Sequence, residues 1–353
     1  MDLIHPHAKH DVVEAMRDAT SHGHRVLVVG GRMHMDRGNP CEIDTELWTT
    51  MLDEVAAYEP AEMLAVVEAG MRVGDLQILL AEAGQEWPVD APADATVGGV
   101  VATGASSFRR LRVGHVRDTV VEIELVTGDG RLVRSGARTV KNVTGYDLHR
   151  LATGSLGTLG VIVQVAVKLR PLPQMRRRLT VEGNGLELGR LMLRCVPSPA
   201  AVIAEPGRVS LWVEGWSEEV DEQAAAAQRA TGGWTVDDDP EPFDPVAVFG
   251  AIDGEVVVEA SVTPSRIADL VSGREDWAAL LGVGLVWFGL PGGREPLDRL
   301  RRAVAEAAGV APVIKGVGGL GDATIAAPAI HRRLKESFDP AGILAPGRFW
   351  GDI

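Results

Sequence analysis

Two glycine-rich stretches constrain the fold of this chain more than any other feature. Residues 139–162 read TVKNVTGYDLHRLATGSLGTLGVI, and residues 96–118 read TVGGVVATGASSFRRLRVGHVRD. In both stretches glycines are mixed with hydroxyl, amide and charged side chains. This composition is typical of backbone that lies close to a ligand, because glycine has no Cβ to hold the ligand away. The sequence therefore predicts that these stretches line a binding site.

Length and composition limit the class of protein. The 353 residues are enough for two domains, each with its own core, and 46 % hydrophobic with 24 % charged residues is ordinary for a soluble protein. No run approaches the roughly 18 apolar residues of a membrane helix, and the N-terminus lacks the pattern of a signal peptide. The two cysteines, Cys41 and Cys195, do not make a disulfide framework. We therefore expect a cytoplasmic protein without a transmembrane segment.

The net charge and the positions of the histidines limit which ligands and partners the protein can be expected to bind. A net charge of −14 argues against nucleic acid, whose phosphates an acidic protein repels. Four arginines nevertheless fall within nine residues, and they predict either a solvated basic turn or an anion site or subunit contact: Arg109, Arg110, Arg112 and Arg117. Five histidines lie within residues 5–24, where no cysteine or carboxylate completes a ligand set. They indicate a mobile histidine-rich end, and no metal site is predicted.

Hydrophobic periodicity predicts the elements of the first half. They are a tail and an amphipathic helix within residues 1–20, a buried strand at 25–31, a strand at 63–68, a helix over 73–84, a hairpin over 120–133, a short helix through Arg150 and a strand at 161–169. Neither a helix nor a strand requires the glycines of residues 96–107, so we expect irregular backbone there that approaches a planar ring.

The second half alternates strand and helix patterns. Strands are expected at 208–214, 255–262 and 283–289, with helices at 220–230 and 297–308. This order predicts an antiparallel sheet with helices on one face. The glycine pattern at Gly316, Gly318 and Gly321 matches a dinucleotide fingerprint, but no second parallel strand follows, so we interpret the match as coincidental.

Several motifs in the same order carry a resemblance to a known family. KNVTGYDL, GSLGTLGVI, VGGVVATGASSFRRLRVGHVRD and FDPAGILAPGR resemble FAD-linked oxidoreductases of the vanillyl-alcohol oxidase type and, within them, the FAD-binding subunits of bacterial glycolate oxidases. The resemblance implies an α+β fold, in which a two-subdomain PCMH-type FAD-binding domain (residues 1–174) precedes a small α+β cap domain with an antiparallel sheet (175–325). Residues 326–353 are expected to return to the flavin domain.

The resemblance also implies a set of FAD-binding residues. They are Gly30, Gly31, Arg32, Met33, His34, Thr96, Gly98, Gly99, Gly104, Ser106, Arg117, Asp118, Lys141, Asn142, Tyr146, Asp147, Gly154, Ser155, Gly157, Thr158, Gly160, Ile162 and Gly347. The loop at residues 30–34 holds the pyrophosphate in the family, but its third glycine and small hydroxyl residue are replaced here by Arg32 and Met33. A guanidinium matches phosphate geometry, so Arg32 is a candidate partner of the pyrophosphate. The offset of His34 from the glycines favours non-covalent FAD.

Function follows from the resemblance as a hypothesis. The leading one is an FAD-binding subunit of a glycolate oxidase or 2-hydroxyacid dehydrogenase complex, which oxidises a small 2-hydroxy acid by hydride transfer to flavin. Arg348 is the candidate electrostatic partner of the flavin ring or substrate carboxylate, and His115 the candidate base. The family implies a second flavoprotein and an iron–sulfur subunit as partners, through which the protein would lie at the membrane periphery.

Two alternatives stay open. The first is a structural or regulatory subunit with weak or lost FAD binding, since the pyrophosphate loop is altered and the cap lacks the closely spaced histidines that metal-using relatives carry. The second is a flavoprotein that oxidises an alcohol or a sugar without partners, because this fold hosts several such chemistries.

Overall fold

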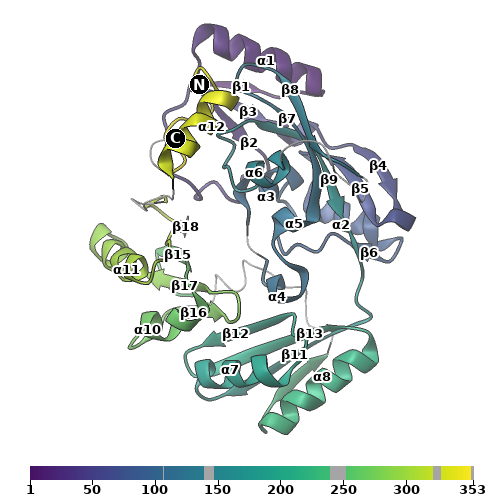
Figure 1. Ribbon diagram of the computed structural model, residues 1–353, viewed down its shortest axis with the longest axis vertical. Coiled ribbons are helices and arrows are strands. Elements are labelled where there is room, and N and C mark those ends of the chain that lie inside the picture. The colour runs from purple at the N-terminus through teal and green to yellow at the C-terminus, as the bar shows by residue number, and fades with distance from the viewer. Residues whose placement is uncertain (106, 139–146, 239–251, 321–326, 351–353) are drawn as a thin grey trace. The chain divides into compact units, whose positions relative to one another are not determined.

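The computed structural model describes residues 1–105, 107–138, 147–238, 252–320 and 327–350 (Figure 1). The chain divides into two compact units by its internal contacts. The first unit comprises Met1–Ser106, His115–Pro171 and Thr324–Ile353, and the second comprises Ser107–Gly114 and Leu172–Ala323. The domain boundaries at residues 174 and 325 stay a prediction. No helix among the described residues is long and apolar enough to span a membrane.

A small parallel sheet begins the first unit. Its strand order is β1 (Asp2–Ile4), β3 (Thr45–Trp48), β2 (Val26–Val29). The expected N-terminal tail is therefore wrong, because Asp2–Ile4 pairs along β3. Helix α1 (Lys9–His22) buries Val12, Met16 and Ala19 and ends at Gly23, whose φ of 68° is left-handed. The predicted helix and the predicted buried strand are both confirmed.

A five-stranded antiparallel sheet forms the rest of the first unit. Its order is β4 (Val55–Glu59), β5 (Leu64–Glu68), β9 (Val161–Lys168), β7 (Val120–Val126), β8 (Leu132–Gly136). The smaller elements are η1 (Thr49–Met51), η2 (Pro60–Glu62), α2 (Val73–Ala81), β6 (Gln85–Glu86), α3 (Val97–Thr103), α5 (Val116–Thr119), α6 (Leu148–Ala152), β10 (Arg170–Pro171) and α12 (Pro328–Phe338). Central strand β9 is buried along its length except at Lys168, because neighbours cover both faces. The predicted strands, hairpin and short helix are confirmed.

Residues 97–103 correct the sequence-based expectation of irregular backbone. They form helix α3, whose N-cap Thr96 accepts a hydrogen bond from the Gly99 amide (3.2 Å). Gly98 has a packing role, because a Cβ there would lie 2.7 Å from the Cβ of Ala69. Gly104, at φ 59°, ends the helix. These glycines therefore let a helix pack closely against the chain that follows β5.

The second unit is an eight-stranded antiparallel sheet (Figure 1). Its order is β14 (Thr235–Asp238), β11 (Met175–Glu182), β13 (Arg208–Gly215), β12 (Ala201–Glu205), β16 (Trp277–Leu280), β17 (Leu285–Leu290), β15 (Val256–Ser261), β18 (Val313–Lys315). The helical elements are α4 (Arg110–Val113), α7 (Gly185–Cys195), α8 (Ser217–Ala230), η3 (Pro264–Arg266), α10 (Ile267–Val271) and α11 (Arg294–Glu306). Because β18 runs antiparallel to β15, the glycines after it do not belong to a parallel dinucleotide-binding unit.

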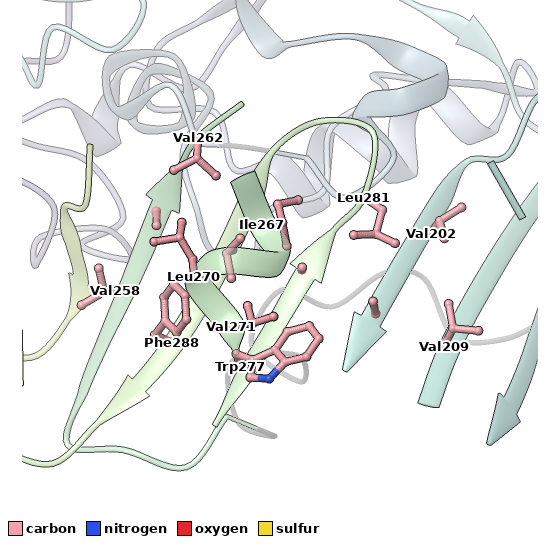
Figure 2. Close-up of a cluster of buried hydrophobic side chains, with 14 of the residues drawn as sticks. Val202, Val209, Val258, Val262, Ile267, Leu270, Val271, Trp277, Leu281 and Phe288 are labelled. Atoms are coloured by element: carbon pink, nitrogen blue, oxygen red, sulfur yellow. The ribbon is translucent and has the colours of Figure 1, made fainter. Parts of the chain in front are cut away.

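Alternate strand residues divide the sheet into two apolar faces. One face packs against α7, α8, α10 and α11 in a single core, as predicted. Figure 2 shows part of this core, where Ile267, Leu270 and Val271 of α10 lie over Val258 and Phe288 of the strands. The opposite face carries a second cluster that includes Ala201, Ile203, Trp212, Leu280 and Trp287.

Two of the four clustered arginines, Arg109 and Arg112, are built into the second unit by ion pairs, whereas Arg117 belongs to the first unit. Phe108 packs on Trp287 (ring centroids 5.1 Å apart), and buried Arg109 pairs with buried Glu214 (3.3 Å). Arg112 pairs with Glu219 (3.0 Å). The expectation of a solvated basic turn is therefore wrong for Arg109, whose charge is neutralised inside the unit.

Candidate functional site

A cavity in the first unit is lined by both glycine-rich stretches and by the loop after β2. The lining residues that the sequence singled out are Gly30, Gly31, Arg32, Met33, His34, Thr96, Gly98, Gly99, Gly157, Gly160, Ile162 and Arg348. Those it did not single out are Val28, Met35, Thr49, Ala95, Ala102, Thr103 and Leu156. Two of these, Ala102 and Thr103, follow Gly99 by three and four residues, so a prediction of helix α3 would have placed them on the same face as Gly99.

The loop after β2 is held by close packing of glycine. A Cβ on Gly30 would lie 2.2 Å from Thr96 Oγ1, and one on Gly31 would lie 2.2 Å from the Asp94 carbonyl oxygen. Any side chain at these positions would therefore displace the loop. Within the described residues, the amides of Gly31, Arg32 and Met33 donate no hydrogen bond to the protein. They form three adjacent donors beside the cavity, an arrangement that suits an anion.

The GSLGTLG segment crosses the cavity from α6 to β9. The Leu156 amide bonds to the Ala102 carbonyl (2.8 Å), which ties the segment to α3. Leu156 and Gly157 both have left-handed φ angles, of 56° and 78°. A Cβ on Gly157 would make only an ordinary contact with Val28, at 3.6 Å. The geometry suits a flat ligand that lies against the main chain.

The C-terminal helix secures the far side of this segment. Lys335 Nζ donates to the carbonyls of Thr158 (2.9 Å) and Leu344 (2.6 Å) and pairs with buried Asp339 (2.8 Å). Burial lowers the pKa of Lys335, and the hydrogen bond with Asp339 opposes that shift. Asp339 in turn accepts the amides of Ile343 (3.1 Å) and Leu344 (2.8 Å). These bonds join the cavity wall to the C-terminal segment.

Arg348 is buried at the cavity wall and holds a loop. Its Nη2 donates to the carbonyls of Met35 (2.9 Å) and Arg37 (2.7 Å), and its own carbonyl accepts the Asn39 amide (2.9 Å). Burial lowers the pKa of the Arg348 guanidinium. Gly38 makes room for this side chain, since a Cβ there would lie 3.0 Å from Arg348 Cγ. Arg348 therefore holds residues 35–39, which directly follow the loop at residues 30–34.

Other residues singled out in the sequence lie outside the cavity lining. They are Gly104, His115, Arg117, Asp118, Asp147, Gly154, Ser155, Thr158 and Gly347. His115 is the N-cap of α5, and its Nδ1 accepts the Arg117 amide (3.1 Å). Gly104 lies against Gly154, where a Cβ would be 3.2 Å from the Gly154 Cα. Ser106, Lys141, Asn142 and Tyr146 lie outside the described residues.

Similarity to known proteins agrees with this geometry. Residues 3–136 match the FAD binding domain family. Glycolate oxidase subunit GlcE of Escherichia coli is 29 % identical, over 85 % of this chain and 85 % of that protein. D-lactate dehydrogenase of Archaeoglobus fulgidus is 27 % identical, over 98 % and 90 %, and glycolate oxidase subunit GlcD of Bacillus subtilis is 24 % identical, over 93 % and 84 %.

The chain carries the FAD binding domain that is typical of the FAD-linked oxidases. Solved structures of alkyldihydroxyacetonephosphate synthase share its PCMH-type α+β fold, with a TM-score of 0.72, 16 % identity and coverage of 98 % of this chain and 77 % of that one. This FAD-linked oxidase is an FAD-dependent oxidoreductase. Its cavity fits the cofactor, because the amides of residues 31–33, which donate to no other described residue, suit a diphosphate, and glycine at position 157 lets a ring lie against the main chain.

Proposed function

We propose that this FAD-linked oxidase is the FAD-binding subunit of a glycolate oxidase-type complex and oxidises a small 2-hydroxy acid. The observation that carries the proposal is the match to glycolate oxidase subunit GlcE over 85 % of both chains, together with a cavity that fits the flavin. The similarity to a D-lactate dehydrogenase over 98 % of this chain supports the same substrate class. We propose a second flavoprotein and an iron–sulfur subunit as partners, and a cytoplasmic or membrane-peripheral location through them.

The cofactor, when bound, accepts hydride from the carbon that bears the substrate hydroxyl. The chain binds and orients the flavin through residues 30–34, α3 and the segment from Gly154 to Gly160. We propose that Arg348 stabilises negative charge at the ring or on the substrate carboxylate. We propose His115 as the base. Its Nδ1 accepts the Arg117 amide, so the neutral ring carries its hydrogen on Nε2, and Nδ1 is the nitrogen that would take the proton once it releases that amide.

The absorption spectrum of the purified protein tests the first half of the proposal. We expect a flavin band that moves to the supernatant after acid precipitation, as non-covalent FAD would. A band that stays in the pellet would instead point to covalent attachment, with His34 as the residue to examine. A colourless protein that added FAD does not restore would contradict the proposal.

Substrate reduction tests the second half. Under anaerobic conditions, glycolate or D-lactate should bleach the flavin of the complex, and a simple alcohol or a sugar should not. The subunit alone serves as the comparison that shows whether partners are needed. Loss of the band only with an alcohol would overturn the assignment to 2-hydroxy acids.

One observation favours a second candidate, a non-catalytic subunit. The nine histidines are His5, His7, His10, His22, His24, His34, His115, His149 and His331, so none belongs to the second unit. Among the described residues, no group of three or more His, Cys, Asp or Glu side chains is arranged to hold a metal ion. A complex that keeps full activity when this subunit carries no flavin would favour this candidate.

A further inference from the structure

We infer that Arg32 binds the FAD diphosphate directly, and that Glu46 and Trp48 hold the guanidinium in place for this contact. Arg32 lines the cavity and occupies the position where the family carries a small residue. Its backbone is left-handed, at φ 58°, directly after the closely packed Gly31. The inference concerns cofactor binding and holds whichever substrate the enzyme oxidises.

The guanidinium is fixed along one edge. Nη2 of Arg32 donates to both carboxylate oxygens of Glu46, and Cζ lies 4.7 Å from the centre of the Trp48 ring. Trp48 Nε1 also donates to Glu46 (2.9 Å), so the three side chains form one unit. Stacking and a buried carboxylate restrict the rotamers of a long side chain, which reduces the entropy lost when it binds a ligand.

The other edge is available to a ligand. Within the described residues, Nε and Nη1 of Arg32 donate no hydrogen bond, and the side chain is 48 % exposed. Beside it are the unpaired amides of Gly31, Arg32 and Met33. Guanidinium and amide donors together match the oxygens of a diphosphate, which accept several hydrogen bonds at once.

The opposite charges of Arg32 and Glu46 explain why the two side chains are needed together. Glu46 is only 5 % exposed, and an unpaired buried carboxylate near this loop would repel a diphosphate. Arg32 cancels that charge through Nη2 and still offers donors on its other edge. A neutral small residue at position 32 would do neither, so the pair Arg32 and Glu46 works as a unit in this chain.

The competing explanation is that Arg32 only neutralises Glu46, while the amides alone bind the diphosphate. A pair of variants separates the two explanations. Replacing Arg32 alone removes both roles at once. Replacing both residues, Arg32→Met with Glu46→Gln, removes the buried charge together with its partner, so that only direct binding by Arg32 is missing. This double variant also keeps the test valid if the single variant does not fold.

The experiment is titration of the flavin-free protein with FAD and, separately, with riboflavin, followed by quenching of flavin fluorescence. We expect Arg32→Met and the double variant to bind FAD about 10- to 100-fold more weakly, the loss of one charge-assisted hydrogen bond. Glu46→Gln should bind FAD at least as tightly as the wild type. Riboflavin has no phosphate, so its affinity should stay unchanged in all variants.

Arg72→Met is the matched control, because Arg72 is an exposed arginine paired with Asp94 outside the cavity. Wild-type FAD affinity in the double variant would show that Arg32 only neutralises Glu46, and would overturn the inference. So would an equal loss of riboflavin affinity, or an equal loss of FAD affinity in Arg72→Met, since either would mean that the effect does not come from a contact with the diphosphate.

Discussion

His149 of α6 is 7 % exposed, and its Nδ1 is the buried side-chain nitrogen that finds no partner among the described residues. Burial lowers the pKa of this imidazole from its ordinary 6.5, since the charged form loses its hydration. The neutral form is therefore the one that the folded state accommodates. The burial of His149 could not be predicted from the sequence, because a histidine between leucine and arginine fits an exposed or a buried helix face equally well.

We predict that the free energy of unfolding falls when the pH is lowered below about 6.5, in part because of His149. The unfolded chain binds a proton near that pH, whereas the folded chain takes it up only at a lower pH. His149→Phe should flatten this part of the stability profile, measured by urea unfolding at pH 5 to 8. A profile that His149→Phe does not alter would contradict the prediction.

Helix α3 illustrates what glycine does in this fold. Gly98 lies where a Cβ would be 2.7 Å from Ala69 Cβ and 2.9 Å from the Ala69 carbonyl. At Gly99 the nearest atom to a Cβ would be the Thr96 hydroxyl, the tip of a side chain. The two glycines adjoin in sequence but have different roles, because a helix turns successive residues toward different neighbours.

We predict that Gly98→Ala destabilises the flavin-free protein by about 1–3 kcal/mol, as overpacking of a tight contact does. Gly99→Ala should change its stability by under about 1 kcal/mol, since alanine favours the helix and only a hydroxyl must shift. Thermal unfolding of the two flavin-free variants compares them directly. Equal midpoints would mean that α3 is not held by its contact with Ala69.

The sequence predicted most helices and strands, but not which side chains from different elements contact one another. Strands β5, β7 and β9 and helix α1 carry clear periodicity, and the structure confirms them. Helix α3 was missed because its glycines are poor helix formers, and packing overrides that propensity. The residues of the cavity were found through motifs, but the partners of Arg32 were not. Glu46 and Trp48 approach Arg32 only because β2 and β3 pair in parallel, which no local pattern encodes.

The points at which the chain passes from one unit to the other also could not be predicted from the sequence. Ser107–Gly114 belongs to the second unit, although residues before and after it belong to the first. The chain therefore passes between the units four times, after residues 106, 114, 171 and 323. The second unit is completed by eight residues that are distant in sequence from the rest of it. Phe108 and Arg109 supply an aromatic contact and an ion pair to its sheet.

A substitution of Arg109 tests how much residues 107–114 stabilise the second unit. Its guanidinium and that of Arg176 both reach Glu214, each at 3.3 Å, and Glu214 is 5 % exposed. Because a buried carboxylate that loses a charged partner is costly, we predict that Arg109→Leu lowers the free energy of unfolding by about 1–3 kcal/mol. Arg112→Leu is the control, and its loss should be smaller because its partner Glu219 is 36 % exposed.

The double variant Arg109→Leu with Glu214→Leu distinguishes an ion pair from simple packing. It removes the buried Glu214 carboxylate together with one of its two guanidinium partners and leaves the partly exposed Arg176, so it should recover most of the stability that Arg109→Leu loses. Tryptophan fluorescence during urea unfolding reports the change, since Trp212 and Trp287 lie in the cluster that includes Phe108. A double variant no more stable than Arg109→Leu would mean that Arg109 acts by packing alone. Recovery would show that Arg109→Leu is destabilising because it leaves the buried Glu214 carboxylate without this partner.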